Sequence, residues 1–198
     1  VLIQCKHTVE NCARAEIEEK NLIETIISEN LQESEILEFK ETFKRPVLSL
    51  TNKKEIKELE KTLQGDLKDK AKDQIQARIA SINNIPIHDK EKQKIVMFST
   101  IKNICAMLNT IGGTIIIGLR DKKDLGIEPV GLRSDYELTG GWDDLELTFH
   151  DWLPNYIFDY EYWQNRIKVE KQVYNEMEFM VIHIERIDSS EKKLCFII

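Results

Sequence analysis

Three acidic side chains of this sequence have the types and spacing that metal-assisted chemistry on a phosphate ester requires. Glu33 and Glu38 flank the start of an apolar segment, ESEILEFKETF, and Asp121 directly follows a second apolar run, TIIIGLR. Carboxylates that are brought together repel one another and shift their pKa values unless a cation lies among them. Mg²⁺ or Mn²⁺ prefers such oxygen ligands, and either ion can polarise a phosphodiester and activate a water molecule.

The two glutamates can meet only if the chain turns between them. On a strand, side chains alternate between the two faces, so Leu37 and Phe39 share one face while Glu38 and Lys40 share the other. Glu33 precedes Glu38 by five positions, which would place the two carboxylates on opposite faces of an unbroken strand. On a helix the same spacing would set them about 140° apart. Convergence therefore predicts a turn ahead of the EFK segment.

The apolar patterns around these acids predict an α+β fold, with a mixed sheet and packed helices. A continuous apolar run is typical of a strand that is covered on both faces, and the two glycines before it end a helix. The expected helices are residues 13–29, 95–108 and 143–153, the last one stopped by Pro154. The expected strands are residues 1–6, 36–43, 114–119, 166–174 and 178–187, with a turn near Asn175 between the last two.

A charged segment between these elements predicts one long helix from about Asn52 to Asn84. Its apolar residues recur every three or four positions, and about 30 residues would span about 45 Å. Gly65 would bend or split this helix. Between Lys53 and Lys94 there are eleven Lys or Arg residues and eight Asp or Glu residues. The mixture favours a solvated face over a basic arm that contacts phosphates, and an uncovered apolar stripe would mediate self-association.

Composition excludes several classes of protein. The net charge of −7 argues against a uniformly basic coat for nucleic acid, although a local basic groove remains open. No apolar run reaches the length of a transmembrane helix, so we expect no membrane contact. The four cysteines lack paired zinc spacing, which favours free thiols in the cytoplasm. The glycines of NTIGGTIIIGLRD follow a helix and precede a strand, without the lysine of a phosphate loop, which argues against ATP binding.

Two motifs together resemble the AlbA-like domain of the Schlafen family, formerly called the divergent AAA domain. The first is ESEILEFK and the second is NTIGGTIIIGLRD with the Val130–Gly131 pair beyond it, and the resemblance covers about residues 30–198. Members bind nucleic acid, and some are metal-dependent endoribonucleases that act on transfer or ribosomal RNA. The resemblance implies Glu33, Glu38 and Asp121 as catalytic metal ligands for Mg²⁺ or Mn²⁺. Lys40, which shares the strand face of Glu38, would contact a phosphate or stabilise developing charge.

The same resemblance leaves two other functions open. One is a non-catalytic DNA- or RNA-binding module of a regulatory or phage-defence protein, because many prokaryotic relatives are described only in such terms. The other is an ATP-binding regulator, which the old family name suggests and the missing phosphate loop opposes. The chain lacks the Cys/His zinc pattern of animal Schlafens, which fits a prokaryotic member.

We divide the chain into an N-terminal segment, residues 1–30, and a nucleic-acid domain, residues 31–198, with a helical insertion at about residues 46–90. The opening VLIQCKHT is similar to the Q-x-K strand of restriction-endonuclease-like nucleases, with Gln4 and Lys6 two positions apart. An ordinary edge strand explains these residues equally well. If the resemblance holds, the segment is the tail of an upstream nuclease-like domain in a longer polypeptide.

Overall fold

The computed structural model describes residues 21–46, 50–65, 69–83, 88–122, 126–186 and 194–197. Residues 1–20 lie outside this set, and with them the predicted first strand, Gln4 and Lys6. The helices are α2 (Leu22–Glu29), α3 (Leu50–Leu63), α4 (Asp69–Asn83), α5 (Lys90–Leu108), α6 (Arg133–Thr139), α7 (Trp142–Tyr156) and α8 (Tyr160–Trp163), with a 3-10 turn at Gln164–Arg166. The strands are β1 (Leu37–Lys40), β2 (Gly113–Ile117), β3 (Leu119–Asp121), β4 (Ile127–Pro129), β5 (Ile167–Tyr174) and β6 (Met177–Ile184).

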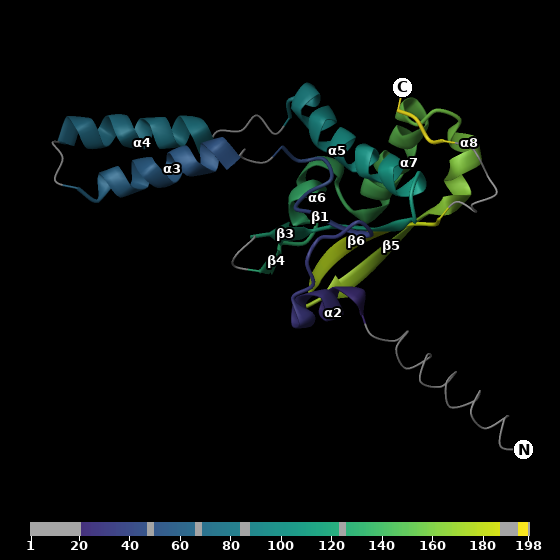
Figure 1. Cartoon of the computed structure of the whole chain (residues 1–198). Coiled ribbons are helices and arrows are strands. Elements are labelled where there is room, and N and C mark those ends of the chain that lie inside the picture. The colour runs from purple at the N-terminus through teal and green to yellow at the C-terminus, as the bar shows by residue number, and fades with distance from the viewer. Residues whose placement is uncertain are drawn as a thin grey trace, which may run out of the picture.

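Four of the strands form one mixed sheet in the order β1-β2-β6-β5. Strand β1 runs parallel to β2, and the other neighbours are antiparallel. Strands β3 and β4 make a separate antiparallel ribbon that continues from β2 after Gly118. This mixed sheet with packed helices confirms the predicted α+β class (Figure 1).

Helices cover both faces of the sheet, which explains why β2 is apolar at successive positions. On one face Ile116 packs with Phe39 of β1 and with Ile23 and Ile26 of α2. On the other face Ile115 and Ile117 join the larger core that α5 and α7 complete. Figure 1 shows α2 on one side of the sheet and α5 to α8 on the other. As predicted, Leu37 and Phe39 share the α2 face.

The double glycine after α5 allows the backbone to pack closely on the sheet. Gly112 has a φ of +78°, and a Cβ at this position would lie 2.5 Å from the carbonyl oxygen of Ile184. A Cβ on Gly113 would lie 2.8 Å from the carbonyl oxygen of Ile36. Protein backbone therefore fills the space beside both glycines.

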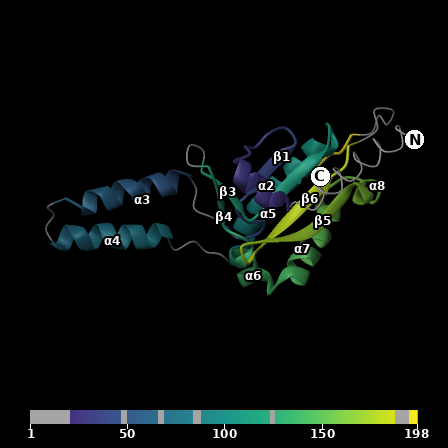
Figure 2. The ribbon, with the colours of Figure 1, turned by 90° about the horizontal axis from the view of Figure 1, so that it is seen from below.

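The charged insertion forms two helices, so the prediction of one long helix is wrong. Helix α3 ends at Leu63, and α4 runs back alongside it as a hairpin (Figures 1 and 2). The apolar stripe thereby folds onto itself, and Ile56 and Ile82 are buried between the two helices. Arg78 of α4 forms a salt bridge with Glu55 of α3 at 2.8 Å. The Gly65 region divides the helix rather than bending it.

Helix α7 continues through Pro154 to Tyr156, so the prediction that this proline ends the helix is also wrong. Proline lacks an N–H group and removes one helical hydrogen bond. Here it lies in the last turn, and the next bond, from the Ile157 N–H to the Leu153 carbonyl oxygen at 2.9 Å, is retained. Among the described residues, no helix combines the length and the apolar character that a bilayer crossing needs.

Candidate acidic site and groove

A tight turn brings Glu33 back toward β1. The N–H of Ser34 donates to the carbonyl oxygen of Leu37 at 2.8 Å, and the N–H of Leu37 donates to the carbonyl oxygen of Ser34 at 3.4 Å. Beyond this turn the Glu33 carboxylate accepts a hydrogen bond from the N–H of Phe39 at 2.9 Å. The turn that convergence of the two glutamates requires is therefore present.

The open edge of β1 explains this contact. Strand β1 is the edge of the sheet, and the carbonyl groups of Ile36 and Lys40 accept from β2. Alternate residues point the other way, so the N–H of Phe39 faces away from the sheet. An unpaired edge N–H needs an acceptor, and Glu33 supplies it. Glu33 is thus placed by the pairing pattern of β1.

Glu38 and Lys40 lie on the opposite face of β1 from Phe39, toward α5. Their side chains form a 2.5 Å ion pair, and each is about a quarter exposed, 24% for Glu38 and 23% for Lys40. Glu38 lines a groove of about 580 Å³ between the turn before β1 and the C-terminal half of α5. The polar groups along this groove also include Ser34, Glu35, Asn103 and Thr110.

Asp121 reaches the same region because the chain bends after β2. Gly118 has a φ of +105°, which redirects the backbone into β3. Arg120 then joins β3 to the end of β1 through Glu41 at 2.5 Å and to β4 through Glu128 at 2.7 Å. The bond to Glu41 is the largest influence on the Arg120 guanidinium and raises its pKa. This ion-pair bridge holds Asp121 beside β1.

The charges of the three predicted acids act on one another. The pKa of Glu33 is raised, first by partial burial and then by the negative charges of Glu38 and Asp121. The Phe39 N–H and the positive charge of Lys40 oppose this rise. Glu38 of β1 and Asp121 of β3 therefore each lie within electrostatic reach of Glu33 in the turn.

The donor chemistry of this cluster suits Mg²⁺ or Mn²⁺, but the side-chain positions do not yet surround an ion. Within the described ranges, no group of three or more His, Cys, Asp or Glu side chains is arranged to hold a metal. The Glu33 carboxylate is engaged by a backbone N–H, and the Glu38 carboxylate is engaged by Lys40. Both of these bonds use Oε1, so a divalent cation would bind the second carboxylate oxygen of each glutamate or displace the present partner.

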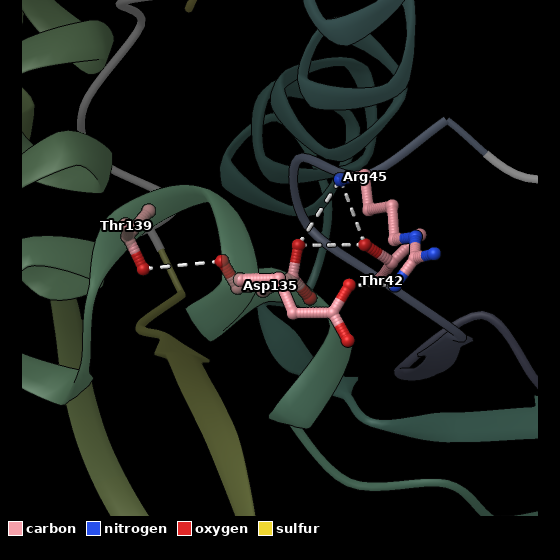
Figure 3. Close-up of polar contacts among 5 residues, drawn as sticks. Thr42, Arg45, Asp135 and Thr139 are labelled. Atoms are coloured by element: carbon pink, nitrogen blue, oxygen red, sulfur yellow. Dashed lines mark hydrogen bonds and ion pairs between the residues drawn. The ribbon is translucent and has the colours of Figure 1, made fainter. Parts of the chain in front are cut away.

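Sequence reasoning missed Asp135, a buried carboxylate at the start of α6 (Figure 3). It accepts from the Thr42 hydroxyl at 2.6 Å and from the backbone N–H groups of residues 43–45 at 2.7 to 3.1 Å. These bonds fix the chain immediately after β1. In the sequence, Asp135 has the pattern of an ordinary acid in the first turn of a helix, and its partners are about 90 residues away, so no local signal identified it.

Asn109, a residue of the NTIGG motif, has a structural role. Its side-chain amide donates to the Cys195 carbonyl oxygen at 2.9 Å and accepts from the Cys195 N–H at 2.7 Å. This pair of bonds attaches the C-terminal segment to the end of α5. Cys105 and Cys195 are buried free thiols, and Cys5 and Cys12 lie outside the described residues.

The model of one protein family matches most of the chain. This model is described as Schlafen, AlbA_2, and it matches residues 33–197. The matched range begins at Glu33 and contains Glu38, Lys40 and Asp121. No curated protein and no solved structure gives a significant match.

Proposed function

The chain belongs to the Schlafen AlbA_2 family, whose members have nucleic-acid-related functions, and from this premise we propose that it is a metal-dependent endoribonuclease. The observation that supports the proposal is that the charges of Glu38 and Asp121 both act on Glu33, and that Glu38 lines an open groove. A carboxyl group whose pKa is raised by burial and by neighbouring acids, close to a groove, is a common sign of a functional site.

Each side chain has a role in this proposal. Glu33, Glu38 and Asp121 would hold Mg²⁺ or Mn²⁺, which when bound supplies Lewis-acid activation of a phosphodiester and of water. Lys40 neutralises Glu38 in the free protein. With Glu38 engaged as a metal ligand, the Lys40 ammonium would be available to bind a phosphoryl oxygen. The groove beside α5 would hold the nucleotides next to the scissile bond, in the cytoplasm where RNA substrates are found.

A non-catalytic nucleic-acid-binding module is the second candidate, and one observation favours it. The Glu38–Lys40 pair is closed, and the described residues contain no ready-made metal site. A protein that only binds RNA or DNA has no need of a cation among its acids. The regulatory or phage-defence role expected for such a module would then depend on an attached domain.

Cleavage and binding assays with isosteric variants separate the two candidates. Wild-type protein and the variants Glu33→Gln, Glu38→Gln and Asp121→Asn are incubated with transfer RNA and Mn²⁺, and cleavage is followed on denaturing gels. Glu29→Gln, at the exposed end of α2, is the matched control. RNA affinity is measured in parallel by fluorescence anisotropy without divalent cations.

The endoribonuclease predicts Mn²⁺-dependent cleavage that falls at least about a hundredfold in the three site variants and is unchanged in Glu29→Gln. RNA binding without cleavage by every form would support the module instead. Cleavage that persists in the site variants would remove these acids from the mechanism. Absence of both binding and cleavage would contradict each of the two candidates.

A further inference from the structure

The hairpin of α3 and α4 belongs to a segment whose charge is opposite in sign to that of the whole chain. Residues 50–83, which span the two helices, contain eight basic and six acidic residues, whereas the chain has a net charge of −7. Positive charge on an otherwise acidic protein marks the surface that a polyanion would approach. The local distribution of this charge determines whether it forms a binding surface.

Three lysines form a stripe on one face of α3. Lys54, Lys57 and Lys61 have the spacing i, i+3 and i+7, so they lie one above another along the helix. All three are exposed, whereas Ile56 faces α4 and is buried. At about 1.5 Å per residue, the stripe is about 10 Å long.

These lysines have no acidic partner among the residues that the structure describes, in contrast to other basic residues. Arg78 on α4 is bound to Glu55. In the body, by which we mean the described residues outside the hairpin of α3 and α4, Lys94, Lys168 and Lys171 each form a salt bridge with a glutamate. Glu58 and Glu60 lie within one helical turn of the stripe, at i+4 from Lys54 and i+3 from Lys57. In the described part of the chain, however, no ion pair joins either glutamate to these lysines. The charge of the stripe is therefore available to an external partner.

The position of the hairpin makes RNA the partner that fits. The hairpin projects from the body and is inserted between β1 and α5 (Figures 1 and 2). The acidic groove lies at the other ends of these two elements, at the turn before β1 and the C-terminal half of α5. A nucleic acid that occupies this groove and follows β1 and α5 toward the insertion would reach the hairpin.

We propose that the Lys54–Lys57–Lys61 stripe binds the phosphate backbone of the RNA whose neighbouring segment lies in the acidic groove. This inference rests on the proposed function and adds a second contact region to it. Phosphates recur about every 3.4 Å along a strand of a duplex, so a stripe of about 10 Å matches about three of them. Such contacts increase affinity and fix orientation without reading the base sequence.

The salt dependence of RNA binding tests the stripe. The full chain is compared with the triple variant Lys54→Gln/Lys57→Gln/Lys61→Gln and with its charge-preserving counterpart, in which the same lysines become arginine. A matched control, Lys94→Gln/Lys168→Gln/Lys171→Gln, removes the same charge from the body. Affinity for a labelled single-stranded RNA is measured by anisotropy without divalent cations at several salt concentrations, and circular dichroism monitors folding.

Loss of three phosphate contacts should reduce the slope of log affinity against log salt by about 2, since each contact on a single strand contributes about 0.7. The arginine variant should keep the wild-type slope, and the body control should change it by less than about 1. Equal effects of the two glutamine triples would overturn the proposal in favour of overall charge. A wild-type slope in the stripe variant would also overturn it.

Failure of the stripe and failure of the proposed function give different results. If wild-type protein binds no RNA, the proposed function fails and the stripe fails with it. If wild-type protein binds RNA and the stripe variant binds equally well, only the stripe proposal fails. If the stripe variant instead loses a self-association that light scattering detects in the wild type, the partner is the acidic body of a second copy, which also overturns the RNA proposal.

Discussion

At the scale of single residues, Glu33 is placed where its charge is unfavourable. Its carboxyl satisfies the edge N–H of Phe39, but partial burial and the charges of Glu38 and Asp121 raise its pKa. An acceptor for the Phe39 N–H does not need a full negative charge, because a neutral side-chain oxygen also accepts this hydrogen bond. The negative charge of Glu33 is therefore not required by this hydrogen bond.

We expect Glu33→Gln to be more stable than the wild type at pH 7 and equally stable at low pH. A carboxyl whose pKa is raised on folding, above the ordinary value of 4.5, holds its proton more tightly in the folded state. Stability is then lost as pH rises from about that ordinary value through the folded pKa. Glutamine keeps the acceptor and avoids this loss, although screening at an exposed site limits the gain to less than about 1 kcal/mol.

Urea denaturation of both proteins between pH 4 and pH 7 measures this difference, because all other titrating groups are shared. The stability difference should grow with pH in favour of glutamine. A difference that is constant across the range, or that favours glutamate at pH 7, would contradict the unfavourable placement of the Glu33 charge.

Asp135 differs from Glu33 because its carboxylate is surrounded by donors. We expect Asp135→Asn to lower the free energy of unfolding by about 3 kcal/mol. An amide group keeps one acceptor oxygen, so its NH2 group would face at least the Phe43 N–H that Oδ2 now accepts. A buried donor left unsatisfied costs about 1 to 3 kcal/mol, and the facing N–H groups also repel each other. Urea denaturation measures this loss. The control is Asp151→Asn, on the exposed face of α7, whose free energy of unfolding should stay within about 0.5 kcal/mol of the wild-type value.

At the scale of elements, the bend at Gly118 separates β3 from the main sheet and directs Asp121 toward β1. A Cβ on Gly118 would lie 2.9 Å from the ring of Phe179 and 3.1 Å from the Cα of Gly131. The φ of +105° is also a conformation that other residues rarely adopt. This glycine therefore links the buried strand to the acidic site.

Gly118→Ala should destabilise the protein by about 2 to 3 kcal/mol, since backbone strain and the contact with Phe179 act together. Gly141→Ala is the matched control, because its backbone is extended and no atom lies within 4 Å of the added Cβ. Thermal unfolding compares the two variants. Equal midpoints would show that the bend tolerates a side chain, in contradiction to the close packing at Gly118.

How much of this architecture the sequence predicts depends on the range of the interactions. The strand β2 and the β5–β6 hairpin with its turn at Asn175 were predicted, because apolar periodicity and turn residues are local signals. The turn before β1 was predicted as a condition for Glu33 and Glu38 to meet. A split at Gly65 was one of the two expected effects of that glycine, but the fold-back of α4 onto α3 was not predicted, because the apolar stripe is the same for one helix and for a hairpin.

Long-range polar contacts were not predictable in the same way. The Asp135 cluster and the Asn109–Cys195 contact each join segments about 90 residues apart, through side chains that are common on surfaces. The family resemblance identified Asn109 as part of a motif, but only the structure shows which backbone it holds. The metal site stays a prediction for a related reason, since three carboxylates can approach one another without enclosing an ion.

At the scale of the whole molecule, the body and the hairpin have separate cores. The two hydrophobic clusters on the faces of the sheet contain no buried residue from α3 or α4 within the described ranges. Ile56 and Ile82 of the hairpin are buried against each other's helices instead. The predicted self-association through an uncovered stripe stays a prediction, although much of that stripe is now covered by the partner helix.

Replacement of residues 50–83 by a short Gly/Ser linker should therefore leave the body folded. The two helices run antiparallel, so the start of α3 and the end of α4 both lie on the side of the hairpin that faces the body (Figure 2). A short flexible linker can therefore replace the hairpin. We expect the thermal midpoint to change by only a few degrees, because no core cluster of the body loses a buried side chain. Cleavage of a short RNA should persist, whereas affinity for a longer RNA should fall as it does in the lysine-stripe variant. A body that unfolds without the hairpin would contradict the separate cores, and would mean that α3 and α4 support the groove directly.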